Sequence, residues 1–242
     1  MDLREFTTGI DEGKHWYYRT KSIPLLRYFE KCVTQKATRL HLLDIGAGSG
    51  FFSQVLLQRF DACIDGVVLV DTGYTQEGIS RNKLDRVQKV TALPDTISNS
   101  FILMMDVLEH LADDRALLAE IRKRTKGRNY FFATVPAFNF MWSSHDEFLG
   151  HHRRYSRTGL VDALCQNGFA VERAYYLYAS IFPLVFLLRK LGPKPVSLKG
   201  DLRPAHPFTN TLLKSVIGIE ARVARINTLF GLTCIAEGSI LT

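Results

Sequence analysis

The stretch that decides the fold is Leu42-Leu43-Asp44-Ile45-Gly46-Ala47-Gly48-Ser49-Gly50, in which three alternate glycines follow a short apolar run. Glycine tolerates the backbone conformations of a tight strand-to-helix turn and lets the backbone approach a ligand closely. The apolar run Leu40–Ile45 predicts a buried strand. Helical spacing of apolar residues over Phe52–Phe60 predicts a helix directly after the glycines.

Outward from this turn, predicted strands and helices alternate as far as Pro136. Strands are expected over Gly66–Val70, Phe101–Met105 and Tyr130–Val135, and a helix capped by Asp113 is expected to reach Lys123. Such alternation predicts an α/β, Rossmann-like, doubly wound fold with a mostly parallel sheet. Because ligands of such folds lie at the carboxyl ends of the strands, we expect the glycine turn, Asp71 and Asp106 to meet at one rim.

Beyond Pro136 the pattern changes. We expect a long polar and aromatic loop over 137–155, a helix over 158–167 ending at Gly168, and a strand over 169–178. A helical insertion, interrupted by prolines, is then expected before a last strand over 232–241. The predicted parts are an N-terminal helical lid or substrate segment (1–39), an α/β core (40–178), a helical insertion or cap (179–230) and the last strand of the core (231–242).

The bulk composition is that of a globular protein of 242 residues, with a formal net charge of +7 that favours anionic partners. The four cysteines are far apart and form no C-x-x-C pair, so neither a zinc cluster nor a disulfide framework is indicated. Residues 1–20 have no apolar core of a secretory signal, and no run of about 18 apolar residues is present. A cytoplasmic location is therefore expected, with membrane association as an open possibility and the oligomeric state undetermined.

The glycine spacing separates two kinds of nucleotide-binding loop. A dinucleotide fingerprint, G-x-G-x-x-G, needs a third glycine at position 51, where this chain has Phe51. The pattern D-x-G-x-G-x-G instead resembles motif I of the class I S-adenosylmethionine-dependent methyltransferases. The resemblance implies S-adenosylmethionine as the cofactor, and it implies that Asp44 helps to position the cofactor's ammonium group. Its other implied contacts in this loop are Gly46, Ala47, Gly48 and Gly50. A tight turn without a ligand is the alternative.

Further segments resemble the same family in the same order. Asp71, followed by Thr72, ends the second predicted strand, where the family places an acid that binds both ribose hydroxyls; a loop acid or helix cap is the alternative. Ala92 and Leu93 match the segment that flanks adenine. Asp106-Val107-Leu108-Glu109-His110 resembles a D-V-L-E-H segment, which implies that Asp106 and Val107 lie near the methyl-transfer centre. His110 is assigned to substrate binding there; the alternatives are a catalytic role, or packing or capping of the following helix.

Two more segments resemble a bacterial subset of these enzymes whose substrates are unassigned. They are His15-Trp16-Tyr17-Tyr18-Arg19, and the region from Trp142 to Tyr155 with H-D and G-H-x-R-R-Y patterns. We expect His145 or His151 to remove a proton from an acceptor hydroxyl, with Asp146 orienting the imidazole. Predicted substrate-binding residues are Arg153 and Arg154, which suit a phosphate or carboxylate, together with Tyr155, His15, Trp16 and Arg19.

Other interpretations of these residues remain open. The histidines cap loops or, with Asp146, bind a metal, although their spacing is not diagnostic and no metal is predicted. Arg153 and Arg154 are alternatively a solvated pair or anchor the loop on neighbouring carboxylates. Trp16 and its neighbours form either a lid or an amphipathic helix fixed to the core. The apolar run 174–188 belongs to the core or rests in a membrane interface beside Lys194, Lys199 and Arg203.

The predicted function is an S-adenosylmethionine-dependent methyltransferase that acts on a small or lipid-linked, anionic acceptor. A methyltransferase for RNA or protein ranks lower because no RNA-binding motif is present, so no specific nucleic acid is predicted. A non-catalytic module that binds a nucleoside is the third hypothesis. A nicotinamide oxidoreductase is disfavoured by Phe51.

Overall fold

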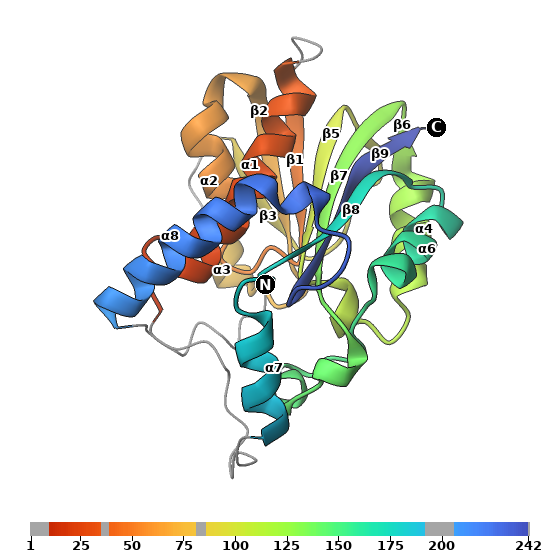
Figure 1. Cartoon of the computed structure of the whole chain (residues 1–242). Coiled ribbons are helices and arrows are strands. Elements are labelled where there is room, and N and C mark those ends of the chain that lie inside the picture. Colours follow the sequence, from red (N-terminus) through yellow and green to blue (C-terminus); the bar gives the residue numbers. More distant parts are fainter. Residues whose placement is uncertain (1–9, 35–38, 81–85, 192–205, 242) are drawn as a thin grey trace.

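A computed structural model describes residues 10–34, 39–80, 86–191 and 206–241 of the chain. In this part of the chain, seven strands form one sheet in the order β3-β2-β1-β5-β7-β9-β8 (Figure 1). Their bounds are β1 Leu40–Ile45, β2 Ile64–Val70, β3 Val87–Val90, β5 Ser100–Met105, β7 Arg128–Pro136, β8 Ala170–Leu177 and β9 Thr233–Leu241. The sheet is parallel from β3 to β7, while β9 runs antiparallel to both of its neighbours. The two-residue strands β4 Ile97–Ser98 and β6 Thr125–Lys126 pair with each other.

Helices cover both faces of this sheet, with α1, α2 and α8 on one side and α4 and α6 on the other (Figure 1). The helices are α1 Trp16–Thr34, α2 Phe51–Phe60, α3 Gln76–Ser80, α4 Asp114–Arg124, α5 Ser144–Leu149, α6 Arg157–Gln166, α7 Phe182–Leu191 and α8 Pro207–Val223. Four short 3₁₀ turns also occur in the described ranges: η2 Asp61–Cys63, η3 Leu108–His110, η4 Asn139–Met141 and η5 Ala224–Ile226. The predicted Rossmann-like, mostly parallel fold is therefore confirmed.

Alternation along the strands sends side chains into two apolar cores. On one face Phe101 of β5 packs against Phe29 and Tyr28 of α1, with ring centroids 5.0 and 5.9 Å apart. On the other face its neighbour Ile102 joins the core that contains Leu118 of α4. All six residues of β5 are buried, and full burial of an apolar side chain stabilises a fold by roughly 1.5–3 kcal/mol. The central strands are therefore rigid supports for the loops that follow them.

The site is positioned by the strand order around β1. The chain passes from β1 through α2 to β2 on one side, whereas β5 pairs with β1 on the other side. Connections leave β1 and β5 in opposite directions, so a crevice opens between their carboxyl ends. Gly46 lies there with φ +65°, and Gly50 caps α2 with φ +76°. Each of these glycines takes a left-handed conformation that other residues adopt only with strain.

Most predicted elements match the observed ones to within two residues at each end. An exception is the predicted loop over 137–155, which contains the helix α5. Ser143 and Asp146 form a capping box at its start, in which each side chain accepts from the other residue's backbone N–H. This pattern satisfies two backbone donors and stabilises a single short helix. The prediction of an uninterrupted loop was wrong because this capping pattern was not recognised.

The apolar run 174–188 divides between two elements. Its first four residues are the buried end of β8, whereas its last seven lie in α7, which buries none of its side chains fully. The predicted helical insertion contains α7 and α8, and α8 is tied to the start of α1 because Trp16 donates its backbone N–H to the Asn210 side chain, at 2.7 Å. Lys194, Lys199 and Arg203 lie outside the described residues. Within the described ranges, no helix combines the length and apolar character that crossing a bilayer requires.

Replacing Gly46 by alanine is expected to destabilise the fold more than replacing Gly127, although both residues have similar positive φ angles. A Cβ on Gly46 would lie 2.7 Å from Cγ2 of Val107, whereas a Cβ on Gly127 would meet no atom within 4 Å. We expect Gly127→Ala to lower the free energy of unfolding by about 1 kcal/mol and Gly46→Ala by about 2–4 kcal/mol. Urea denaturation without ligand measures both losses. Equal losses would show that contact with Val107 does not constrain the turn.

Candidate functional site

Two cavities open beside the carboxyl ends of the parallel strands. The first, here called the wide cavity, has a volume of about 580 Å³ and lies beside the ends of β1, β2 and β5. The second, here called the narrow cavity, has a volume of about 260 Å³. It lies between three helices: the start of α1, the short helix α5, and α7. Asp106 and His110 line both of them. The two cavities therefore meet where the chain leaves β5.

The wide cavity is lined by most of the residues predicted to hold the cofactor: Gly46, Asp71, Thr72, Ala92, Leu93, Asp106 and Val107. The other predicted residues, Asp44, Ala47, Gly48 and Gly50, belong to β1 and its turn but do not line this cavity. Asp71 connects the turn to the end of β2, because its carboxylate accepts the N–H of Gly48 at 2.9 Å and that of Gly73 at 2.8 Å. Its oxygens retain lone pairs that can accept further hydrogen bonds.

Asp44 lies behind the glycine turn, almost fully buried, and its carboxylate accepts a hydrogen bond from the Ser53 hydroxyl at 2.7 Å. Burial raises the pKa of Asp44 to about 6, the nearby Asp71 carboxylate adds to this shift, and the Ser53 bond opposes it. A cation bound near the turn would favour the ionised form, because opposite charges stabilise each other strongly in a buried setting.

Asp106 is the most constrained side chain at the junction of the two cavities. Its backbone is left-handed, with φ +55°, and the Thr134 hydroxyl of β7 donates to its Oδ1 at 2.9 Å. Its Oδ2 accepts from the Tyr17 hydroxyl at 3.2 Å and forms an ion pair with Lys21. Burial opposes the charge of Asp106, but the Lys21 ammonium and the Thr134 bond outweigh it and keep the pKa of Asp106 below its ordinary value.

Lys21 has a side chain with 0% exposure and was not predicted as a site residue. A signal for it exists in the sequence: Tyr18 and Leu25, three residues before and four after it, share the buried face of α1. A basic residue on the apolar face of a helix requires an acidic partner, since an unpaired buried charge is very costly. The sequence does not say that Asp106, 85 positions later, is that partner.

The narrow cavity has an aromatic wall built by the start of α1 and by Tyr178, the residue that follows β8. Tyr17 and Tyr178 stack with centroids 5.5 Å apart, and Trp16 meets Tyr178 edge to face at 5.8 Å. The Tyr178 hydroxyl donates to the Tyr17 carbonyl at 3.0 Å, which fixes the pair. α7 contributes Ile181, just before its start, and then Val185 and Arg189. Rigid aromatic faces of this kind bind apolar or planar parts of a ligand.

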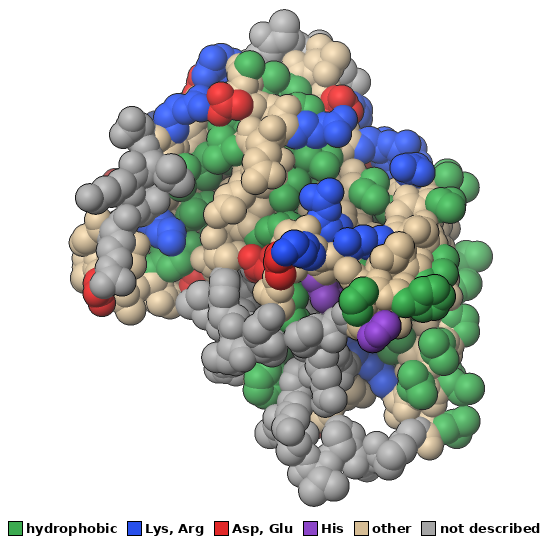
Figure 2. Space-filling model, turned by 90° about the vertical axis from the view of Figure 1, so that its left-hand side faces the viewer, with side chains coloured by type: hydrophobic (Ala, Val, Ile, Leu, Met, Phe, Trp, Pro, Cys, Tyr) green, Lys and Arg blue, Asp and Glu red, His purple; other side chains and the backbone are tan. Residues whose placement is uncertain are grey.

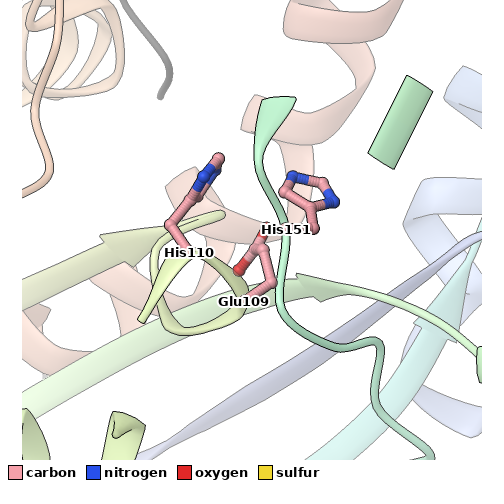
Figure 3. Close-up of side chains that lie close together, drawn as sticks. All are labelled: Glu109, His110 and His151. Atoms are coloured by element: carbon pink, nitrogen blue, oxygen red, sulfur yellow. The ribbon is translucent and has the colours of Figure 1, made fainter. Parts of the chain in front are cut away.

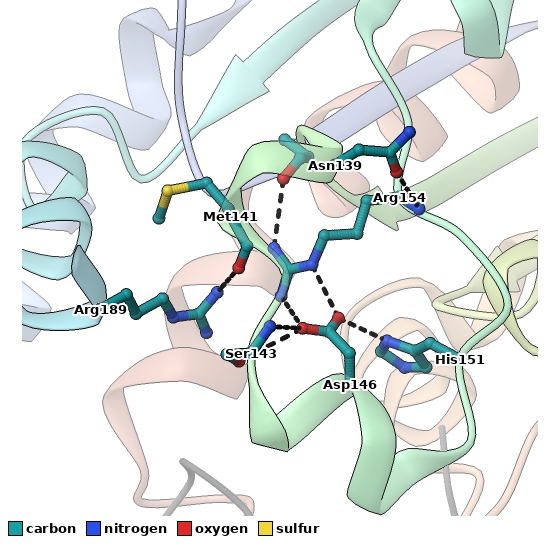
Figure 4. A network of polar contacts seen from close by, with 8 residues as sticks. Asn139, Met141, Ser143, Asp146, His151, Arg154 and Arg189 are labelled. Carbon is teal, nitrogen blue, oxygen red and sulfur yellow. Dashed lines mark hydrogen bonds and ion pairs between the residues drawn. The ribbon is translucent and has the colours of Figure 1, made fainter. Parts of the chain in front are cut away.

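On the opposite wall, Asp146 organises a polar network (Figure 4). Its Oδ1 accepts from Nδ1 of His151 at 2.9 Å and from Nε of Arg154 at 2.7 Å, and its Oδ2 accepts from the second guanidinium arm at 2.9 Å. Ser143 adds a backbone N–H at 2.8 Å. Although burial opposes ionisation, the His151 and Arg154 bonds hold the pKa of Asp146 well below its ordinary value. Asp146 is therefore a permanent carboxylate that orients His151.

The predicted catalytic residues lie close together: His145 and His151 line the narrow cavity, and their ring centroids are 6.5 Å apart. His110 also lies there, with its ring 4.6 Å from that of His151. Glu109, which received no role from the sequence, lines the same cavity and is fully buried. Burial and the neighbouring Asp106 carboxylate raise the pKa of Glu109 well above its ordinary value. Its position next to His110 in the D-V-L-E-H segment was the available signal.

The predicted substrate-binding residues divide into two groups. Trp16, His110 and Arg154 line the narrow cavity, but the Arg154 charge is matched by Asp146. The remaining four line neither cavity: His15, Arg19, Arg153 and Tyr155. Arg153 bonds to Asp114 at 2.9 Å, and the Tyr155 hydroxyl donates to the same carboxylate at 2.5 Å.

This geometry corrects the prediction of a paired-arginine anion site: both guanidinium groups anchor the loop on acids of the chain itself, the alternative left open by the sequence. His15 is buried against Trp16 and Tyr18, with ring centroids 5.6 and 6.0 Å apart, and Arg19 is exposed away from both cavities. Neither position supports contact with a substrate in the narrow cavity.

A family of methyltransferases is recognised over the part of the chain that lines the wide cavity and much of the narrow one. The sequence profile described as "Methyltransferase domain" matches residues 15–174, which is more than half of the chain. The chain belongs to this family. It is a class I methyltransferase that uses S-adenosylmethionine, as the glycine turn indicated. Comparison with curated proteins finds no match.

Solved structures share the fold of this methyltransferase at low sequence identity. A putative methyltransferase from Haloferax volcanii, in complex with the Trm112 methyltransferase activator, has a TM-score of 0.61 at 20% identity, covering 99% of this chain and 94% of that chain. An S-adenosylmethionine-dependent methyltransferase from Archaeoglobus fulgidus has a TM-score of 0.53 at 18% identity, covering 97% and 98%. A COG1565 superfamily member and likely methyl transferase from Burkholderia thailandensis, bound to S-adenosylhomocysteine, has a TM-score of 0.51 at 12% identity, covering 90% and 76%.

We propose that ionised Asp44 attracts the cofactor's ammonium group, which predicts a pH-dependent affinity. The pKa of Asp44 is about 6 without a ligand, so the carboxylate is charged at pH 7.5 and mostly protonated at pH 5. The dissociation constant for S-adenosylhomocysteine is expected to rise about tenfold as the pH falls through this window, because one pH unit below the pKa leaves about a tenth of the carboxylate ionised. Calorimetric titration at pH 5, 6 and 7.5 measures it.

Asp44→Asn provides the control, since it retains the shape of the side chain and removes its titration. The pH dependence of its dissociation constant reports the titrating groups other than Asp44. The dissociation constant of the wild type is expected to change more steeply with pH than that of the variant. Parallel curves for the two proteins would show that Asp44 does not attract the ammonium group.

Proposed function

We propose that this methyltransferase transfers the methyl group of S-adenosylmethionine to a lipid-linked, anionic acceptor bound in the narrow cavity, with a hydroxyl as the methylated group. The observation that carries this proposal is the two-sided character of α7. One face of this helix lines the narrow cavity, while the other exposes a row of leucines. A small, water-soluble anionic acceptor is the alternative that the same cavity supports.

The cofactor is proposed to occupy the wide cavity. There Asp71 would bind the ribose hydroxyls and Ala92 and Leu93 would flank the adenine, as the resemblance implies. The cofactor supplies a methyl group activated by its sulfonium. Placing the methyl group beside Asp106 would direct it toward the narrow cavity, because this residue lines both cavities.

Anion recognition is proposed to centre on Arg189. Its guanidinium lines the narrow cavity and donates to the Met141 carbonyl oxygen at 2.6 Å (Figure 4). Asp146 and Asp106 match the charges of two other cations near this cavity, Arg154 and Lys21. A formal net charge of +7 for the chain adds long-range attraction for anions.

The exposed face of α7 supports a lipid-linked acceptor. Ile181, Val185 and Arg189 follow one another at intervals of four and line the cavity, whereas the leucines of α7 do not line it. These leucines, at 184, 187, 188 and 191, have exposures of 54–77%. α8 exposes further apolar side chains, among them Phe208, Leu212 and Ile219, and Figure 2 shows hydrophobic side chains gathered along one edge of the molecule. Such an apolar surface beside basic residues favours binding at a lipid interface.

The chemistry proposed at the junction is an in-line displacement. The aromatic wall and Arg189 would hold the acceptor so that its oxygen lies in line with the methyl–sulfur bond, and positioning of this kind lowers the barrier substantially. As the new carbon–oxygen bond forms and the carbon–sulfur bond breaks, the hydroxyl proton passes to an imidazole, His145 or His151. The aromatic side chains exclude water from the methyl group.

A double substitution on the exposed face of α7, Leu184→Ser with Leu188→Ser, is expected to reduce transfer to a lipid acceptor. Without these side chains the enzyme loses apolar contact with the interface, where each buried leucine contributes roughly 1.5–3 kcal/mol. We expect binding to anionic phospholipid vesicles to weaken at least tenfold. Incubation with methyl-labelled S-adenosylmethionine and the organic-soluble fraction of a lysate is expected to show a matching loss of labelled product.

The matched control is Leu241→Ser, an exposed leucine at the end of β9, which is expected to retain vesicle binding and transfer. All variants should bind S-adenosylhomocysteine equally. If the label enters only the aqueous small-molecule fraction, the acceptor is a small, water-soluble anion and not a lipid-linked one. Label that enters RNA or protein alone would contradict the proposed acceptor class.

A further inference from the structure

Three potential metal ligands converge on the floor of the narrow cavity. The ligand atoms of Glu109, His110 and His151 all lie within 4.8 Å of one another. Glu109 and His110 come from η3, directly after β5, and His151 comes from the segment that follows α5 (Figure 3). Chain segments about 40 residues apart therefore bring one carboxylate and two imidazoles together.

The polar atoms of Glu109 and His151 require partners that the described residues do not supply. Both carboxylate oxygens of Glu109 are buried without a hydrogen bond, and so is Nε2 of His151. Glu109 has an exposure of 0%, and the His151 side chain has 5%. Leaving such buried groups unsatisfied destabilises a fold, and a charged group does so more than a neutral one. Both side chains line the narrow cavity, which is where a ligand would satisfy these three atoms.

His151 is oriented for coordination by a residue behind it. Nδ1 lies 2.9 Å from Oδ1 of Asp146, and this carboxylate can only accept a hydrogen bond, so the proton is on Nδ1. Nε2 then carries a lone pair directed away from Asp146. Metal-binding histidines commonly have such a carboxylate behind them, which fixes the ring and raises its basicity. Arg154 and Ser143 hold Asp146 in place from the other side.

We propose that Glu109, His110 and His151 bind one divalent transition-metal ion, of the zinc, cobalt or manganese class, at the floor of the narrow cavity. Two imidazole nitrogens and one carboxylate form a ligand set typical of these ions. All three residues line the narrow cavity, so coordination positions not taken by the protein face the acceptor. The positive ion would also balance the Glu109 carboxylate, which has both Asp106 and Lys21 as charged neighbours.

The role of the metal in transfer rests on the proposed function, whereas its binding does not. A hydroxyl coordinated at an open position loses its proton more readily, because the cation stabilises the oxyanion. His151 is then a ligand, and His145 is the imidazole of the cavity that receives the proton. The oxygen attacks the methyl carbon, the carbon–sulfur bond breaks, and its electron pair stays on sulfur. This assignment narrows the acceptor to an alcohol or a phenol.

The test is metal binding by the full-length protein after removal of metal with a chelator. Titration with Co²⁺, followed by visible absorption, and with Zn²⁺, followed by calorimetry, is expected to show one ion per chain. Glu109→Gln and His151→Ala are each expected to weaken binding at least tenfold. Mg²⁺ is expected to bind more weakly than Zn²⁺, since it prefers oxygen ligands in an octahedral set.

His152→Ala is the matched control. The His152 side chain is exposed and next to His151 in the sequence, and its backbone N–H, which the substitution retains, donates to the backbone carbonyl oxygen of Glu109 at 2.7 Å. It is expected to bind metal as the wild type does. Circular dichroism and S-adenosylhomocysteine affinity verify that the variants fold. Failure of the wild type to bind Co²⁺ or Zn²⁺, or equal affinity in the ligand variants, would overturn the proposal. Metal binding without methylation of a lipid acceptor would contradict the proposed function alone, and full transfer by the chelated protein would overturn the catalytic role of the metal.

Discussion

The ion pair between the fully buried Lys21 and the partly exposed Asp106 is the contact on which the geometry of both cavities depends. It joins the N-terminal helix to the carboxyl end of a central strand, at the residue that separates the wide cavity from the narrow one. Removing the Asp106 carboxylate would leave the Lys21 ammonium inside the protein without its charged partner, and a loss of this kind typically costs about 3–5 kcal/mol. Because Thr134 and Tyr17 bind the same carboxylate, the start of α1 has little freedom to move. The aromatic wall that α1 carries is positioned as a consequence.

A second constraint is the matching of charges around α5. The carboxylates of Asp146 and Asp114 each form an ion pair with an arginine, Arg154 and Arg153 respectively. These internal ion pairs hold the segment between β7 and α6 in place. These contacts leave His145 and His151 at the surface of the narrow cavity rather than in solvent. Arg189, from a different element, then becomes the cation proposed to face the acceptor. The segment between β7 and α6 thus forms one side of the narrow cavity, and α7 contributes the guanidinium of Arg189 to it.

The sequence was sufficient to predict the fold because the determining signals are local. Three alternate glycines after an apolar run, and strands that end at Asp71 and Asp106, specify the turn and the rim without knowledge of distant contacts. Asp106 was found for the same reason, since its position follows from where a strand ends.

Contacts between distant segments were not predictable in this way. Lys21 was missed because its partner comes 85 positions later, and Glu109 was missed because its burial arises only when the helices pack. Arg153 and Arg154 were interpreted as an anion site because the sequence shows two adjacent cations but not the acids they meet. Ser143 and Asp146, by contrast, carried a local capping signal, so the error over α5 was avoidable.

The most direct test of this account is a crystal structure of the enzyme with S-adenosylhomocysteine. We expect adenine beside Leu93, the ribose at Asp71 and the sulfur next to Asp106, facing the narrow cavity. A nucleoside bound in the narrow cavity, or a sulfur directed away from Asp106, would contradict it.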